Sequence, residues 1–157
     1  MFFILVSIMV PIIIYAFFPK AIQMLTGTSI KRDGMLLLAC LVYLLSWYLP
    51  SPLINGQNTA FTTHLVGGGV FSGLLWLFAK QQLQWKASWL IELLSLYVFV
   101  SALGVANELF EFAASELKFV RINGADTWWD LCANTLGALG FWVFYQIAIQ
   151  TRLGNRK

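Results

Sequence analysis

Charged residues are scarce in this chain of 157 residues. Asp, Glu, Lys and Arg together make up 11% of it, whereas a soluble domain carries about 25%. Hydrophobic residues make up 59%, and the mean hydropathy is +0.75. This composition excludes an ordinary soluble enzyme. It predicts a small multi-pass membrane protein with a single integral-membrane domain over residues 1–157.

Histidine and cysteine are also rare, and this limits the possible chemistry. The one histidine is His64, and the sequence contains nothing that resembles a Ser-His-Asp triad, a haem site or a phosphate-binding loop. Cys40 and Cys132 fall at different depths of their predicted helices, so we expect no disulfide between them. Internal repeats are lacking as well, which argues weakly against a transporter, because many transporters are built from repeats.

Five apolar stretches are long enough, or nearly so, to cross a bilayer, which takes about 20 helical residues. They cover residues 2–18, 34–49, 60–79, 88–113 and 128–149. The first stretch has neither a basic segment before it nor a small-x-small cleavage pattern after it. We therefore interpret it as a retained anchor and not as a signal peptide. The predicted fold is an all-α bundle of five transmembrane spans.

Basic residues predict the orientation of this bundle. Eight of them follow the first or third stretch or lie in the tail: Lys20, Lys31, Arg32, Lys80, Lys86, Arg152, Arg156 and Lys157. The opposite side holds only Lys118 and Arg121. Because cytoplasmic loops are enriched in Lys and Arg, we expect the N-terminus outside and the C-terminus in the cytoplasm, in the cell (inner) membrane. The net charge of +3 therefore reflects topology and does not indicate nucleic-acid binding.

Polar side chains gather near one end of the third, fourth and fifth stretches. They are His64, Glu108, Glu111, Asp130 and Asn134. In the predicted topology all five lie roughly 3–9 Å below the outer interface, at 1.5 Å of rise per residue. An Asp at the centre of a membrane helix costs about 2.5–3.5 kcal/mol on a translocon scale, and less near the ends. Several such groups at one depth predict a functional site.

Spacing places these groups on common helical faces. Glu108 and Glu111 are three residues apart, and Asp130 and Asn134 are four apart, so each pair shares a face. Neighbouring carboxylates repel each other unless a proton, a cation or Arg121 relieves them, which predicts one proton shared between Glu108 and Glu111.

Small residues beside the polar groups predict close helix packing. Gly69 and Gly73 have the small-xxx-small spacing that lets helix backbones approach, and Gly137 and Gly140 continue a small-residue stripe in the last stretch. Close packing of the third, fourth and fifth stretches would bring the polar faces together. The expected site is therefore an outward-facing pocket among these three helices.

The order of these motifs resembles the VanZ-like family. The shared pattern is a His near the start of one apolar helix, an acidic pair in the next, and D-x3-N followed by L-G-A-x-G in the last. The segments ELFEF and DTWWDLCANTLGALG look similar to the YjdF-like inner-membrane branch, and the likeness covers about residues 64–142. Glu111 stands where the family often has Gln, and Arg121 stands where it has a basic residue. The resemblance implies a cell-envelope protein, in one branch linked to glycopeptide-antibiotic resistance, without an established reaction.

The first functional interpretation is a site for the head group of an envelope lipid or lipid-linked glycan. Lys118 and Arg121 could pair with a phosphate, and His64 or a carboxylate could move a proton. Trp128 could line an entry from the outer leaflet, although Trp residues at this level also form ordinary interface belts. The candidate catalytic residues are His64, Glu108, Glu111 and Asp130, and the candidate binding residues are Asn134, Arg121 and Trp128.

Other interpretations stay open. The four catalytic candidates are also possible ligands for zinc, manganese or iron in a metal-assisted hydrolase, although a second histidine is missing and no cofactor is otherwise expected. An intramembrane glutamate protease is discounted, because its adjacent glutamates are missing too. The remaining alternative is a non-catalytic protein, structural or serving assembly or small-solute transport, in which the cluster is an interhelical network. Glu92, at the opposite end, is expected to pair with Lys80 or Lys86.

Overall fold

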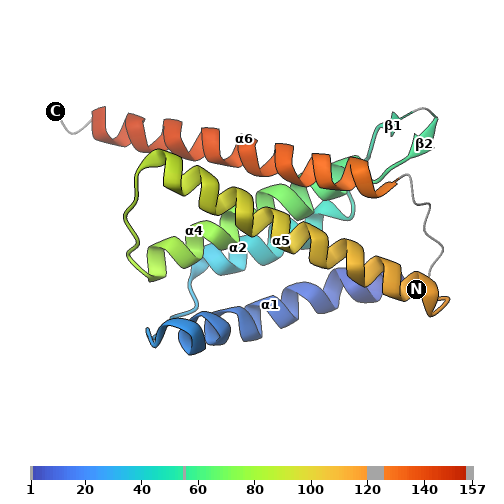
Figure 1. Cartoon of the computed structure of the whole chain (residues 1–157), viewed down its shortest axis with the longest axis horizontal. Helices are drawn as coiled ribbons and strands as arrows, with labels where there is room; N and C mark the ends of the chain where they lie inside the picture. Colours follow the sequence, from blue (N-terminus) through green and yellow to red (C-terminus); the bar gives the residue numbers. More distant parts are fainter. Residues whose placement is uncertain (1, 55, 120–125, 155–157) are drawn as a thin grey trace.

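Helices account for almost all of the chain in the computed structural model, which describes residues 2–54, 56–119 and 126–154 (Figure 1). The helical elements are α1 (Phe2–Thr26), α2 (Gly34–Ser46), α3 (Phe61–Thr63), the π-helix η1 (His64–Val70), α4 (Phe71–Gln82), α5 (Trp89–Glu116) and α6 (Asp126–Gly154). Strands β1 (Leu53–Ile54) and β2 (Gln57–Asn58) form a two-residue antiparallel hairpin. The predicted helical membrane bundle is confirmed at this level.

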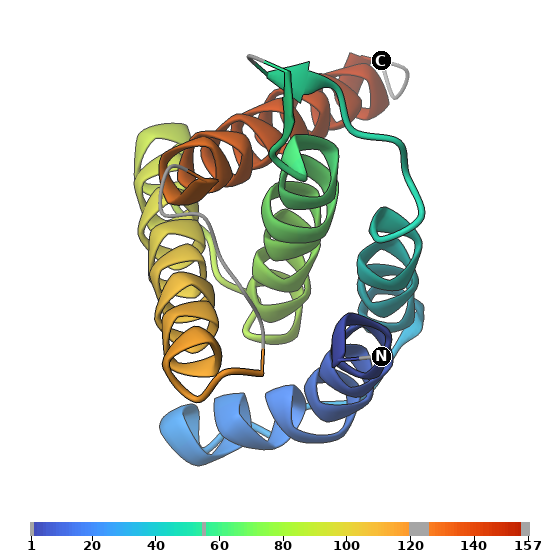
Figure 2. The same cartoon turned by 90° about the vertical axis from the view of Figure 1, so that its right-hand side faces the viewer.

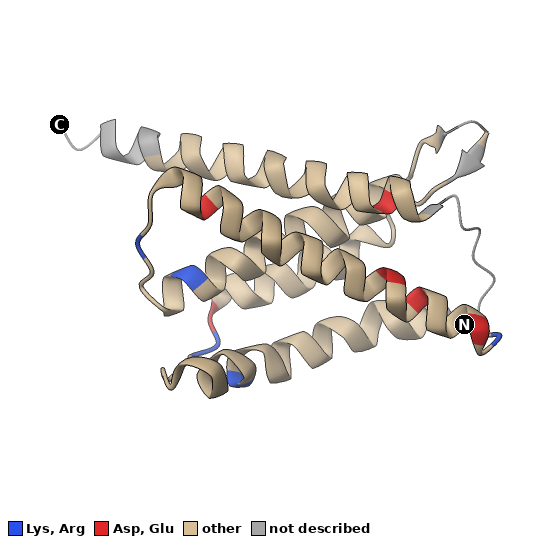
Figure 3. Ribbon diagram, in the orientation of Figure 1, with Lys and Arg blue, Asp and Glu red and all other residues tan. Residues whose placement is uncertain are grey.

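Successive long helices alternate in direction through the bundle (Figure 1). α1 ends and α2 begins at one end, where α4 also ends and α5 begins; the hairpin, the start of α3 and the start of α6 lie at the other. Most of the described Lys and Arg residues lie toward the first end, and most of the described Asp and Glu residues lie toward the second (Figure 3). The alternation is the arrangement that a chain crossing a membrane repeatedly requires.

Among the described residues, four helical segments are long and apolar enough to cross a membrane: Ile4–Thr26, Phe61–Gln82, Trp89–Glu116 and Thr127–Ile149. The second predicted span is shorter, because α2 has 13 residues. At 1.5 Å per residue it extends about 20 Å, less than the roughly 30 Å of a hydrocarbon core. Four candidate spans are therefore present among the described residues, and α2 is a shorter apolar helix.

The first helix continues past the predicted end at residue 18 and reaches Thr26. Pro19 lies inside α1 and has no N–H to bond the carbonyl of Tyr15. The Arg32 side chain supplies a donor in its place, with Nε 3.0 Å from the Tyr15 carbonyl oxygen, and its Nη2 also donates to the Ala16 carbonyl at 3.1 Å. A residue beyond the helix thus stabilises α1 across its proline.

Asp33 begins α2 and joins it to the end of α4. Its Oδ1 accepts hydrogen bonds from the backbone N–H groups of Met35 and Leu36 at 3.0 and 3.2 Å, as an N-cap does. Its Oδ2 accepts a hydrogen bond from Gln82 Nε2 at 2.9 Å. These bonds fix one end of the bundle.

The central helix is α4, which lies among the other helices (Figure 2). Every residue from 71 to 78 is buried, as is typical of a helix that is apolar on all sides. One core cluster joins Phe71, Leu75 and Phe78 to residues of α1 and α2. A second cluster joins Trp76 and Leu77 to residues of α5 and α6. α4 thus holds the two halves of the bundle together.

Two glycines allow η1 and α6 to touch through their backbones. A Cβ atom on Gly69 would lie 2.6 Å from the Cα of Gly137, and a Cβ on Gly137 would lie 1.9 Å from the Leu65 carbonyl oxygen. The predicted close packing is confirmed at these positions. Gly140 does not take part, because a Cβ atom there would meet nothing within 4 Å.

Candidate functional site

His64 is positioned by an irregular start to the third long helical segment. Ala60 adopts a left-handed conformation with φ of 51°, and one helical turn follows it. The Thr62 N–H donates to Ser51 Oγ at 3.1 Å, which ties this turn to the preceding loop. His64 is the first residue of the π-helix η1. π-helices are rare and often occur at functional sites, because their wider turn redirects side chains.

Three of the four predicted catalytic residues meet in space, each from a different element. His64 comes from η1, Glu108 from α5 and Asp130 from α6. One possible ligand atom from each residue lies within 4.8 Å of the other two. The Nε2 atom of His64 lies 3.4 Å from the Oδ1 atom of Asp130. Asp130 is buried, with 3% of its surface exposed. We call these residues the His64 group.

Glu111, the fourth predicted catalytic residue, is not in the His64 group. Its Oε1 accepts a hydrogen bond from Asn107 Nδ2 at 2.8 Å, one turn back on α5. Glu111 and Asn107 line a cavity beside the His64 group, whereas Glu108 belongs to that group. The two glutamates therefore have different surroundings, and a proton shared between them stays a prediction.

Asn134 occupies the place where η1, α5 and α6 meet. It is 4% exposed. A Cβ on Gly68 would lie 1.7 Å from its Oδ1, and a Cβ on Gly104 would lie 3.2 Å from its Nδ2. The amide thus needs the glycine at position 68 and packs closely on Gly104, and it borders the same cavity as His64.

Trp128, another predicted binding residue, is not part of this site. Trp128 is 74% exposed and is not among the residues that line the cavity, which agrees with an interface belt. Arg121 lies outside the described residues. Lys118, its proposed partner in phosphate binding, is exposed just beyond the end of α5.

A cavity of about 760 Å³ opens beside the His64 group. Its polar lining comprises His64, Asp130, Asn134, Asn107, Glu111, Ser46, Ser72 and Thr63, together with the aromatic residues Tyr43 and Trp47. Its apolar lining includes Val6, Val10, Ile14, Phe71, Val100 and Leu103. No Lys or Arg occurs among the described residues that line it.

The cavity changes character along its length. On α5 its lining runs from Glu111 and Asn107 to Leu103 and Val100, which is about 16 Å at 1.5 Å per residue. The wall is also wider than predicted, because α1 and α2 contribute to it as well as the three helices that carry the polar groups. The result is an amphipathic cavity with one polar end.

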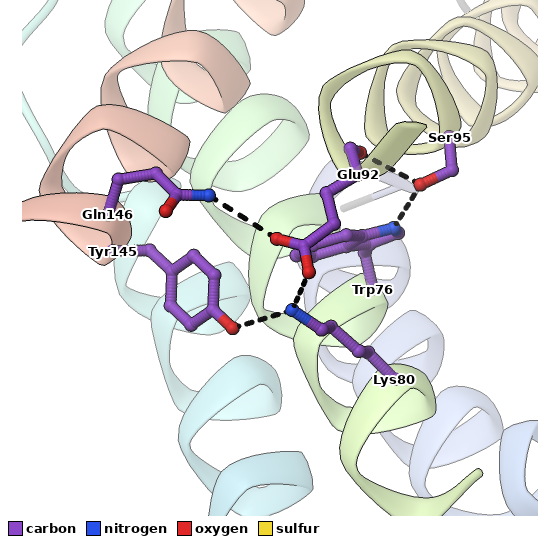
Figure 4. Close-up of polar contacts among 6 residues, drawn as sticks. All are labelled: Trp76, Lys80, Glu92, Ser95, Tyr145 and Gln146. Atoms are coloured by element: carbon purple, nitrogen blue, oxygen red, sulfur yellow. Dashed lines mark hydrogen bonds and ion pairs between the residues drawn. The ribbon is translucent and has the colours of Figure 1, made fainter. Parts of the chain in front are cut away.

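A second polar cluster lies at the opposite end of the bundle (Figure 4). Lys80 forms an ion pair with Glu92, which confirms the predicted pairing. Lys80 Nζ also donates to the Tyr145 hydroxyl at 2.8 Å, and Gln146 Nε2 donates to Glu92 Oε2 at 3.3 Å. No sequence pattern indicated Tyr145 or Gln146, which lie more than 50 residues beyond Glu92 in the chain. None of these residues lines the cavity. The cluster links α4, α5 and α6 through these contacts and thereby stabilises the bundle.

No family model matches this chain, and comparison with curated proteins and with solved structures finds no match either. The resemblance to the VanZ-like family therefore rests on the order of its motifs alone.

Proposed function

We propose that the chain is a five-span protein of the cytoplasmic membrane whose cavity faces outward and binds an envelope lipid or lipid-linked glycan. The observation that carries this proposal is the amphipathic cavity, with apolar walls and one polar end. Its volume, about 760 Å³, lies within the roughly 300–1,000 Å³ of known ligand pockets. An acyl or prenyl chain fits the apolar part, and hydroxyl or amide groups fit the polar end.

The charge distribution supports the orientation. Basic residues are concentrated at the end of the bundle opposite the His64 group (Figure 3). Because cytoplasmic loops are enriched in Lys and Arg, that end is cytoplasmic and the polar end of the cavity lies near the outer surface. This is the side on which envelope precursors are assembled into the envelope, in keeping with the motif resemblance.

Modification of the bound molecule is a further part of this proposal. His64 borders the cavity, so its imidazole can accept a proton from a ligand hydroxyl, and the neighbouring Asp130 carboxylate would stabilise the imidazolium that forms. Glu111 lines the same cavity as a second group able to take a proton. These residues would act as acid and base, and Asn134 would position the ligand.

One observation favours a second function, that of a non-catalytic membrane protein. Asn134 packs tightly against Gly68 and Gly104, as expected of a residue that holds three helices together. In that case the polar groups form an interhelical network. Single alanine replacements of His64, Glu108, Glu111 and Asp130 separate the two functions. If the residues form a ligand site, the variants fold normally and lose ligand binding. If they form an interhelical network, the variants fail to fold.

Photolabelling tests lipid binding directly. The purified protein is mixed with a phospholipid that carries a photoreactive group in its acyl chain. Leu103→Trp fills the apolar wall and is expected to lower labelling about 10-fold, since the chain can no longer enter. Leu109→Trp is the matched control on the same helix, because Leu109 is 62% exposed, and it should label like the parent chain. Equal labelling of both variants would contradict the proposal.

A further inference from the structure

The His64 group has the donor atoms of a metal site. One imidazole nitrogen and two carboxylates from three separate elements converge within 4.8 Å. These are donors that Zn²⁺ and Mn²⁺ accept in proteins. Three protein ligands that leave one position open are also the pattern of metal sites that bind a further ligand.

The spacing within the group fits coordination better than hydrogen bonding. His64 Nε2 and Asp130 Oδ1 are 3.4 Å apart. An N–H···O hydrogen bond spans about 2.7–3.2 Å, so this pair is too far apart for a good one. Two ligands of a tetrahedral ion with bonds of about 2.0–2.1 Å lie about 3.4 Å from each other. The observed separation therefore suits two ligands of one ion.

Glu108 supplies an independent observation. Its Oε1 atom is buried and receives no hydrogen bond from any described residue. A buried carboxylate oxygen without a donor loses its hydration without replacement. A cation held between Glu108 and Asp130 would restore that interaction. The buried oxygen of Glu108 thus points to a positively charged ligand.

Charge around the group leads to the same conclusion. Two carboxylates and one imidazole meet here, a third carboxylate, Glu111, lines the adjoining cavity, and the rest of the described lining has no Lys or Arg. Buried charges are normally paired or bound to a metal. A divalent cation bound by this group would balance the negative charge of its carboxylates.

We infer that His64, Glu108 and Asp130 bind one first-row divalent cation, Zn²⁺ or Mn²⁺, at the polar end of the cavity. Because His64 and Asp130 also line the cavity, the ion would be accessible to a molecule bound there. A divalent ion would allow this acidic cavity to accept an anionic head group. That last consequence rests on the proposed lipid binding, whereas ion binding does not.

Metal analysis of the full chain tests the inference. The protein is purified in detergent, stripped with chelator, dialysed against Zn²⁺ or Mn²⁺ and analysed by mass spectrometry of the elements. About one ion per chain is expected. Loss of an outer-shell partner typically lowers metal affinity 10–100-fold, so loss of a ligand in Glu108→Gln should lower it at least about 10-fold. Glu116→Gln is the matched control, since Glu116 is exposed at the end of the same helix and should keep the ion.

An absorption spectrum with Co²⁺ distinguishes the loss of a metal ligand from misfolding of a variant. In a chain with Cys40 and Cys132 replaced by serine, His64→Cys places a thiolate in the site, and added Co²⁺ should give a thiolate–cobalt charge-transfer band. Absence of that band in a folded variant, or equal ion content in Glu108→Gln and the parent chain, overturns the inference. Leu103→Trp should keep the ion, because Leu103 is not a ligand, so metal binding and lipid binding can fail separately.

Discussion

At the scale of single residues, Asn134 shows how packing and chemistry share one position. Its side chain fits only because Gly68 leaves room for it, and it also packs closely on Gly104. The same side chain borders the cavity beside His64. A change at Asn134 would therefore disturb both helix packing and the polar end of the cavity, so the glycines around it are better probes of packing.

Gly137 and Gly140 offer a matched pair on one helix. Gly137→Ala places a Cβ 1.9 Å from the Leu65 carbonyl oxygen, a backbone atom that cannot move without shifting η1. Overpacking of this kind typically costs about 1–3 kcal/mol. Gly140→Ala meets nothing within 4 Å and should be neutral or stabilising by up to about 1 kcal/mol. Thermal unfolding in detergent measures both, and equal stability of the two variants would contradict the close contact.

The sequence predicted the shared face of Glu108 and Glu111 but not their separate surroundings. A helix turns 100° per residue, so side chains three positions apart differ by about 60° in direction. That difference lets Glu108 join the His64 group while Glu111 lines the cavity. Only the positions of the neighbouring helices decide which carboxylate meets His64, and spacing along one helix does not contain that information.

At the scale of helices, the interaction of Arg32 with α1 explains a boundary that sequence patterns place too early. Pro19 usually marks the end of a helix, because it removes a hydrogen bond. Here the donors come from a side chain 17 residues beyond the first of the two carbonyls it reaches. These hydrogen bonds form only because the chain after Gly27 folds back along α1, and local helix propensity contains no information about that contact.

Arg32 and Pro19 should therefore be coupled energetically. Arg32→Ala leaves the Tyr15 and Ala16 carbonyls without these donors and should cost about 1 kcal/mol, because the bonds are exposed. In a Pro19→Ala background residue 19 regains its N–H, so the same Arg32→Ala change should cost less. A double-mutant cycle by thermal unfolding measures the difference. Additive effects would mean that Arg32 does not compensate for Pro19.

Lys80 and Glu92 provide the corresponding prediction for α4 and α5. Their side chains are 13% and 9% exposed. Lys80→Met would leave Glu92 buried without its cation and should cost about 3–5 kcal/mol, whereas Lys80→Met with Glu92→Leu should recover most of that loss. Lys86→Met, which changes an exposed neighbour, should stay within about 0.5 kcal/mol. If the double variant is as unstable as Lys80→Met, the loss of stability comes from lost packing and not from the unpaired Glu92.

At the scale of the whole molecule, the sequence predicted the helical bundle well and the cavity only in part. Long apolar stretches and the distribution of Lys and Arg were sufficient for the helices and their alternation. The contribution of α1 and α2 to the cavity was missed, because Val6, Val10 and Ile14 would look the same in the sequence whether they faced a cavity or lipid. The π-helix at His64 was missed for a related reason, since a glycine run is compatible with several helical forms.

The short helix α2 makes the topology a testable property of the whole chain. If α2 crosses the membrane, every later helix runs as proposed; if it does not, the sides of all later helices are exchanged. Leu117 and Leu83 report the two sides, since they are the C-caps of α5 and α4, which end two of the long apolar segments, and they are 68% and 36% exposed. Neither residue is charged, so replacing it leaves the distribution of Lys and Arg unchanged.

In a chain without Cys40 and Cys132, we expect a membrane-impermeant maleimide to label Leu117→Cys in intact cells and to leave Leu83→Cys unlabelled until the membrane is opened. Thr28→Cys, in the exposed connection after α1, should behave like Leu83→Cys and fixes the side on which α1 ends. Labelling of Leu83→Cys with protection of Leu117→Cys and Thr28→Cys would show that α2 turns back within the membrane. The polar end of the cavity would then face the cytoplasm, and its ligand would have to come from the inner leaflet.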